Sequence, residues 1–149
     1  MVNLNKKFLK SFAIILSFVL VVFLISRQTV SMGTVVLGGV EVQVELAQTA
    51  EGQSKGLSGR ETIAEGEGML FIFEQEGRTG FWLKNVRFPL DLIWINKDKK
   101  IVDIQPNAHP CQADDCLTYY PHKDASFGLE VNAGFVARHK LRIGDRVDF

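Results

Sequence analysis

The sequence predicts a mainly β fold: a single antiparallel domain, barrel-like or sandwich-like, with one or two short helices and an N-terminal hydrophobic helix ahead of it. Three observations lead to this prediction. Apolar and polar residues alternate near the start of the domain, several later apolar runs are too short for a helix, and strand-like stretches outnumber helix-like ones. Most neighbouring stretches can be joined by short turns, which favours antiparallel pairing.

Lysines precede the apolar segment near the N-terminus, and almost no basic residue follows it. Lys6, Lys7 and Lys10 lie before the uncharged run 12–25, after which Arg27 is the only nearby basic residue. Basic residues stay on the cytoplasmic side of a membrane, so we expect the rest of the chain to be exported.

We expect residues 1–32 to be either a signal-anchor or a cleaved signal peptide. An apolar core of about 14 residues suits a signal peptide, whereas a spanning helix needs roughly 20 residues. Residues 33–149 would then form a domain that faces outward from the cytoplasmic membrane. If the segment is cleaved, that domain is periplasmic or extracellular. The membrane is the partner that the N-terminal helix predicts.

The domain is expected to open with a hairpin and a short helix. Residues 40–46 alternate between apolar and polar side chains, as in a strand with one buried face. Gly38 and Gly39 can form a two-residue turn, which would pair residues 34–37 with that strand. Thr49 is a suitable N-cap for a helix that the following glycines keep short.

The remaining elements are predicted in chain order. Apolar and aromatic content predicts strands at Met69–Phe73, 79–85, 89–96, 101–106 and 126–132, and a short strand after Gly144 and Asp145. The strand at 101–106 should return antiparallel to its predecessor, and residues 105–124 should form one long loop because prolines interrupt them. Asn132 is expected to cap a helix over residues 133–140.

Four ordered motifs resemble one protein family. They are Gly56, Leu57 and Arg60; Gly68–Phe73; Lys84 and Asn85 with Pro89, Leu90 and Asp91; and Leu129, Glu130 and Gly134. In this order and spacing they resemble the family catalogued as domain of unknown function 192, over roughly residues 35–149. The resemblance implies a small, mainly β domain of unassigned activity that is often exported.

Asp91 is a candidate ligand-binding residue because its strand has no wet face. It shares one face with Ile93 and Ile95, so its carboxylate should be partly desolvated and should need a partner. The nearby candidates for that partner are Arg60, Lys84, Asn85 and Arg87. Two interpretations remain open: a structural bond to a side chain or to loop backbone, and a role in ligand binding or acid–base chemistry.

Glu130 is the second carboxylate of interest. It lies on the opposite face of its strand from Leu129 and Val131, where it could cap the following helix or accept from Arg60. If Asp91, Glu130 and Lys84 converged in one cleft, the set would suit hydrolysis or sugar binding.

The candidate ligand-binding set is therefore Arg60, Lys84, Asn85, Asp91 and Glu130. The two tryptophans leave a choice between stacking on a ligand ring and core packing.

Cys111 and Cys116 are predicted to form a disulfide because an exported protein meets an oxidising environment. A metal site with His109 or His122 and a redox pair are the alternatives. Two thiolates alone do not close a structural metal site, and the spacing is not Cys-x-x-Cys. We therefore expect neither a metal nor a cofactor.

Composition and motifs narrow the function classes. Basic and acidic residues number 17 each and no basic stripe is present, so nucleic-acid binding is not expected. No serine-hydrolase, phosphate-loop, zinc-protease or dinucleotide motif occurs.

Three hypotheses follow. The first is an exported, membrane-tethered domain that binds a small ligand or an envelope partner. The second is an envelope hydrolase that acts on a glycan or related polymer through Asp91 and Glu130. The third is a structural or assembly partner of another envelope protein.

Overall fold

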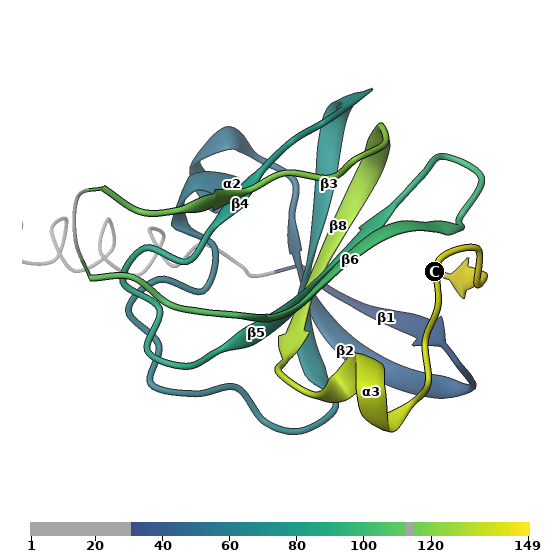
Figure 1. Ribbon diagram of the computed structural model, residues 1–149, viewed down its shortest axis with the longest axis horizontal. Coiled ribbons are helices and arrows are strands. Elements are labelled where there is room, and N and C mark those ends of the chain that lie inside the picture. Colours follow the sequence, from purple (N-terminus) through teal and green to yellow (C-terminus); the bar gives the residue numbers. More distant parts are fainter. Residues whose placement is uncertain (1–30, 113–114) are drawn as a thin grey trace, which may run out of the picture. The chain divides into compact units, whose positions relative to one another are not determined.

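A computed structural model describes residues 31–112 and 115–149 of the protein (Figure 1). The predicted N-terminal hydrophobic helix lies outside the described residues. Within the described ranges, no helix has the length and apolar character needed to span a membrane.

The domain is built on a seven-stranded sheet with strand order β6-β5-β8-β3-β2-β1-β9. A separate two-stranded sheet pairs β4 with β7. The strands are β1 (Met32–Leu37), β2 (Val40–Ala47), β3 (Glu67–Gly77), β4 (Phe81–Trp82), β5 (Leu90–Ile95), β6 (Ile101–Ala108), β7 (Thr118–Tyr119), β8 (Ala125–Asn132) and β9 (Val147–Asp148). Two short helices, α2 (Ala50–Lys55) and α3 (Phe135–Arg138), complete the described elements.

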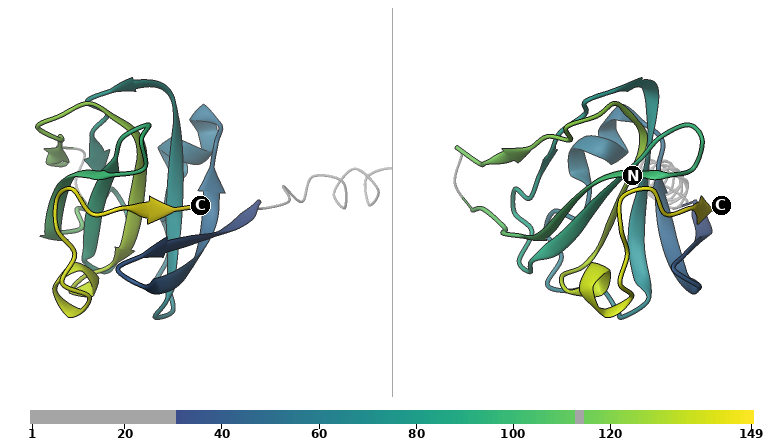
Figure 2. Two further views of the ribbon diagram at one scale, coloured as in Figure 1. Left: turned by 90° about the vertical axis from the view of Figure 1, so that its right-hand side faces the viewer. Right: turned by 45° about the vertical axis from the view of Figure 1, so that its right-hand side comes forward.

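The prediction of a mainly β domain with short helices is confirmed, but the sheet is a curled half-barrel and not a closed barrel (Figure 2). The segment before β9 meets the start of β6 through an isolated bridge between Lys100 and Arg146. In the described part of the chain, no continuous ladder joins these two edge strands. The sheet is also not purely antiparallel, because α2 and the segment after it carry the chain across so that β2 and β3 pair in parallel.

The predicted opening of the domain is confirmed. Gly38 and Gly39 have φ of 60° and 79°, a backbone conformation that glycine adopts at low cost, and they connect β1 to β2. Thr49 caps α2, since its side chain accepts a hydrogen bond from the Gly52 amide at 3.1 Å.

Two predicted elements differ from the structure, a strand and a loop. The strand expected over 79–85 is reduced to β4, and Asn85 turns the chain with a φ of 59°. The loop expected over 105–124 is shorter, because β6 continues to Ala108 and β7 forms within it.

The sequence predicted that Asn132 caps the following helix, and this prediction is wrong. The side-chain amide of Asn132 donates to the carbonyls of Ile63 and Ala64 instead. The helix α3 is confined to Phe135–Arg138, and Gly134 lies at its N-terminus with a φ of 84°. A capping oxygen for α3 comes from a different strand, as described below.

Each face of the sheet carries its own hydrophobic cluster. One cluster combines β1, β2, Leu129 and Val131 with Phe135 of α3 and with Val147 of β9. The other combines alternate residues of β3 and β5 with Leu57, which follows α2, and with Phe81 of β4. Figures 1 and 2 show α2 beside β4 and apart from α3. We call these the α3 face and the α2 face.

Candidate functional site

The α2 face contains a small pocket, which we call the Glu130 pocket. It has a volume of about 60 Å³. Its walls come from the end of α2, from β3, from the segment around β4, from the segment after β4 and from β8. The lining residues are Gln53, Ser54, Lys55, Gly56, Leu57, Phe71, Phe73, Thr79, Gly80, Phe81, Trp82, Lys84, Val86 and Glu130.

Two features of the sequence hold the walls of this pocket in place. The side-chain amide of Gln53 fastens α2 to the sheet by donating to the carbonyls of Ile72 at 2.7 Å and Ala47 at 3.3 Å. Gly128 lets the ring of Phe81 lie directly on the sheet, since a Cβ atom there would come within 2.2 Å of that ring. An aromatic wall therefore stands next to Glu130 on the same face of β8.

Glu130 is the buried polar group of this pocket. Its exposed fraction is 4%, and its Oε2 atom has no hydrogen-bond partner among the described residues. Burial among apolar side chains raises the pKa of this carboxyl to about 8. At neutral pH Glu130 is therefore mainly a neutral carboxylic acid, which can donate one hydrogen bond and accept others. It neither caps α3 nor pairs with Arg60.

Asp91 is also fully buried, but both of its oxygens have partners. Oδ1 accepts from the backbone amide of Asn107, in the irregular part of β6, at 2.8 Å. Oδ2 accepts from the amide of Val136, in the first turn of α3, at 2.8 Å. Asp91 thus ties β6 and α3 to β5, and none of its sequence-predicted side-chain partners is among these contacts.

Asp91 and Glu130 lie on opposite faces of the sheet. Asp91 is paired across the ladder with Val131, and Glu130 with Leu92. Residues that face each other in an antiparallel ladder point to the same side, so adjacent positions point to opposite sides. The shared cleft that would let the two carboxylates act on one bond is therefore not formed.

Arg60 pairs with Glu45, which was not among its predicted partners. Its guanidinium forms a bidentate ion pair with the carboxylate of Glu45 on β2, with both N–O distances at 2.6 Å. This hydrogen-bonded pairing raises the pKa of Arg60. Asn85 is exposed and contributes its backbone, donating to the carbonyl of Cys111 and accepting from the amide of Gly59.

Lys84 is the other candidate that the structure brings to Glu130, since both residues line the pocket. The backbone of Lys84 forms a parallel bridge with Cys111. Of the two tryptophans, Trp94 is buried in the α2-face cluster, whereas Trp82 lines the pocket and is 50% exposed.

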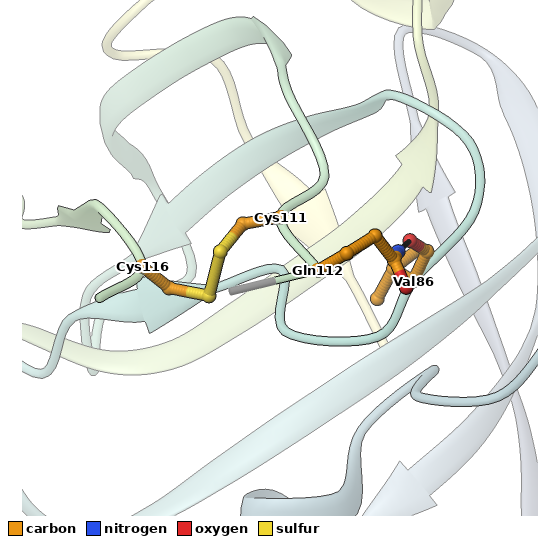
Figure 3. Close-up of a disulfide and its surroundings, with 4 residues drawn as sticks. All are labelled: Val86, Cys111, Gln112 and Cys116. Atoms are coloured by element: carbon orange, nitrogen blue, oxygen red, sulfur yellow. Dashed lines mark hydrogen bonds between the residues drawn. A yellow bond between two sulfur atoms is a disulfide. The ribbon is translucent and has the colours of Figure 1, made fainter. Parts of the chain in front are cut away.

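The disulfide between Cys111 and Cys116 is confirmed, with a Cα–Cα distance of 5.7 Å. It belongs to the segment that supports the pocket wall. The amide of Cys111 donates to the carbonyl of Leu83, and the side chain of Gln112 donates to the carbonyl of Val86 at 2.8 Å (Figure 3). Within residues 31–112 and 115–149, no group of three or more histidine, cysteine, aspartate or glutamate side chains is arranged to hold a metal ion.

Several pocket residues were not found from the sequence. Lys55, Gln53 and Phe81 line the pocket together with Glu130 only because α2 and β4 pack on the sheet. A short helix rich in glycine and polar residues carries no signal that its end will close a pocket. The Gly-Leu motif that follows α2 was the one available indication, because Leu57 is buried at this wall.

Comparison with solved structures supports the same fold. The chain is similar to a protein of unknown function from Novosphingobium aromaticivorans, with a TM-score of 0.76 and 29% identity over 83% of this chain and 89% of that one. It is also similar to a protein from Sinorhizobium meliloti described as a "putative transcription regulator", with a TM-score of 0.73 and 29% identity over 83% of this chain and 97% of that one.

A search of curated proteins finds no match to the chain. A family model described as "Uncharacterized ACR", the domain of unknown function 192, matches residues 33–149. This match covers the curled sheet apart from the first residue of β1, both short helices and the Glu130 pocket. The chain therefore belongs to the domain of unknown function 192 family, which is uncharacterised.

Proposed function

We propose that this protein is an exported domain that binds a small ligand in the Glu130 pocket without catalysis. The observation that carries the proposal is that Glu130, one of the residues lining the pocket, has a buried Oε2 atom with no partner among the described residues. Buried polar atoms are nearly always hydrogen-bonded, because leaving one unpaired costs roughly 1 to 3 kcal/mol. A ligand with a polar end and an apolar body would supply the missing hydrogen-bond partner and would pack against the aromatic side chains of the pocket.

Export and membrane tethering are part of the same proposal. The lysines before the apolar N-terminal segment support translocation of the domain. The Cys111–Cys116 disulfide supports an oxidising compartment. Protease accessibility of the domain in intact spheroplasts tests this part. Degradation from outside is expected, and protection until the membrane is permeabilised would contradict it.

A ligand screen on the full-length chain in detergent micelles tests the binding function. The readout is the thermal midpoint of wild type, of Glu130→Leu and of Glu74→Gln, which changes an exposed glutamate of the same domain. A pocket ligand should stabilise wild type and Glu74→Gln but not Glu130→Leu. Hits that stabilise all three proteins equally would place binding elsewhere.

A docking role for an envelope partner is the second candidate. Three large apolar side chains in or beside the β4–β7 sheet are more exposed than is usual: Trp82 at 50%, Leu117 at 66% and Tyr120 at 65%. A photo-crosslinking residue at position 120 tests this role in intact cells. One discrete adduct that Trp82→Ser abolishes is expected, and the absence of a discrete adduct would contradict it. The geometry does not support the hydrolase alternative, because Asp91 and Glu130 lie on opposite faces of the sheet.

A further inference from the structure

The seven-stranded sheet has two edges, and they differ in how well they are protected. Strand β6 forms one edge, and β1 forms the other except where β9 covers its end. An edge strand presents unpaired backbone N–H and C=O groups to any chain that can extend the sheet. The protection of each edge therefore indicates where a second chain can add a strand.

The outer edge of β6 is closed by groups of the same domain. The backbone of Ile101 forms two hydrogen bonds with the C-terminal segment, at 2.9 and 2.8 Å. The amide of Ile104 donates to the side chain of Asp103 at 2.9 Å instead of to another strand. Pro106 has no N–H group. A buried charge and a proline are both means by which proteins keep an edge strand from pairing.

The outer edge of β1 lacks such protection over residues 32–35. A two-residue turn joins β1 to β2, so Leu37 and Val40 face each other as a hydrogen-bonded pair. The amide of Leu46 donates to the carbonyl of Ser31, which continues the same alternation at the other end of the strand. Odd-numbered residues of β1 therefore bond to β2, and even-numbered residues direct their backbone groups outward.

Two of these outward positions have no backbone partner among the residues that the structure describes. Strand β9 pairs with Val36 and Leu37, which leaves the N–H and C=O groups of Met32 and Thr34 unpaired. Both side chains are exposed, and β1 contains no charged residue that would repel a neighbouring strand. Figure 2 shows this part of β1, in dark blue, on the outside of the domain. An uncharged edge of this kind is a site for strand addition.

We propose that β1 pairs with β1 of a second copy of this chain, antiparallel and centred on Gly33. Met32 of each copy would face Thr34 of the other, and each such pair would exchange backbone hydrogen bonds. Antiparallel pairing around a two-fold axis lets the same strand serve both copies, and Gly33 on the axis brings no side chain into the contact. The inference goes beyond the proposed pocket function and uses only the membrane tether that is part of it.

The segment that precedes β1 favours a second copy as the partner. The apolar run ends at residue 25, so residues 26–31 connect it to β1 and can extend at most about 20 Å. Copies tethered to one membrane would hold their β1 strands at a similar height and at a high effective concentration. Pairing centred on Gly33 also brings the two Met32 residues to within about 8 Å, so both tethers leave from one place. The contact is small, and a small contact needs such a concentration to be populated.

Crosslinking between two variants that each add one cysteine tests the pairing and its register. Full-length Met32→Cys and Thr34→Cys, with tags of different size, are co-expressed, and isolated membranes are oxidised. Paired positions lie about 5.5 Å apart between Cα atoms, within the range that a disulfide spans, whereas the same position in two copies lies about 8 Å apart. The heterodisulfide should therefore exceed either homodisulfide by roughly tenfold. Lys97→Cys, in the exposed β5–β6 turn, should crosslink with neither variant.

Proline variants test whether the backbone makes the contact. Thr34→Pro, added to the Met32→Cys copy, removes an outward N–H and no bond to β2, so the heterodisulfide should fall by roughly tenfold. Thr34→Val in the same copy keeps that donor and should leave the yield unchanged. Met32→Pro, added to the Thr34→Cys copy, is a second test at the first residue of the strand, where proline is tolerated. Thermal midpoints show that each variant is folded.

A heterodisulfide no more abundant than the homodisulfides or the Lys97→Cys products would overturn the pairing. A heterodisulfide that folded proline variants leave unchanged would also overturn it. Disulfides that join position 32 or 34 to a different protein would replace the second copy with another partner. The spheroplast assay tests the tether separately. An exported domain that gives no heterodisulfide would therefore overturn this inference and leave the proposed function standing.

Discussion

Asp91 and Glu130 are buried carboxyl groups on neighbouring strands of one sheet, and their surroundings differ completely. On the α3 face, Asp91 receives two backbone amides, one from β6 and one from α3. On the α2 face, Glu130 has an oxygen with no partner among the described residues and lines a pocket. Burial is common to both, so it cannot distinguish their roles. The number of partners does so: Asp91 ties β6 and α3 to β5, and Glu130 is the group that we propose for ligand binding.

Replacing Asp91 should have the largest effect on stability, because Asp91 is the carboxyl whose two oxygens both bind backbone amides. Asp91→Ala leaves the amides of Asn107 and Val136 buried without acceptors, which should cost about 4 kcal/mol of unfolding free energy. Urea unfolding measures this loss. Asp98→Asn, in an exposed turn, is the matched control and should change stability by less than about 0.5 kcal/mol. A loss below about 1 kcal/mol for Asp91→Ala would show that Asp91 is not structural.

Glu130 should make stability depend on pH in a direction opposite to that of most carboxylates. Its pKa in the folded state, about 8, lies above its ordinary value of 4.5, so the folded state binds more protons between these values. Its contribution is full below pH 4.5 and is lost as the pH rises through 8, a change of roughly 5 kcal/mol. Unfolding of wild type and Glu130→Gln across this range measures it. Parallel pH profiles for the two proteins would contradict the account.

Removing the disulfide should affect the α2 face and spare the α3 face. Replacing Cys111 and Cys116 by serine should lower the unfolding free energy by about 2 kcal/mol or less, since the loop that the disulfide closes is short. Hydrogen exchange should rise at the amides of Asn85 and Val86. The amides of Asn107 and Val136 should keep their protection, and equal loss on both faces would show that the disulfide does not act locally.

The Arg60–Glu45 pair offers the smallest and most specific test. Arg60 is 37% exposed, so Arg60→Met should destabilise the domain by about 1 kcal/mol or less. Because Arg60 pairs with Glu45 and not with Glu130, the titration of Glu130 should be unchanged in this variant. A shift of the Glu130 titration would show that the two groups communicate.

Local patterns in the sequence predicted much of the fold. The hairpin around Gly38 and Gly39, the Thr49 cap and the antiparallel return of β6 depend on residues close together in the chain. The parallel pairing of β2 with β3 and the absence of barrel closure depend on contacts between distant segments. Periodicity records which face of a strand is buried but not which strand lies beside it.

The candidate site was predicted in part for the same reason. The lack of a wet face along β5 predicted that Asp91 would be desolvated, and Asp91 is buried. Glu130 was expected to cap a helix or to pair with Arg60, and it is buried without doing either. The pattern did not predict the partners. The amides that bind Asp91 belong to residues 16 and 45 positions away, and backbone groups carry no side-chain signature in the sequence. Arg60 was expected near these carboxyls, but it pairs with Glu45 of β2, a contact between segments that no local pattern predicts.

The central claim is that Glu130 is a buried, neutral carboxyl in the lining of a pocket, and an NMR titration of its side-chain carboxyl carbon tests that claim directly. Selective ¹³C labelling of glutamate, with Glu130→Gln for assignment, allows the pKa of this carboxyl to be measured. We predict a pKa near 8. A pKa near the ordinary value of 4.5 would contradict the account.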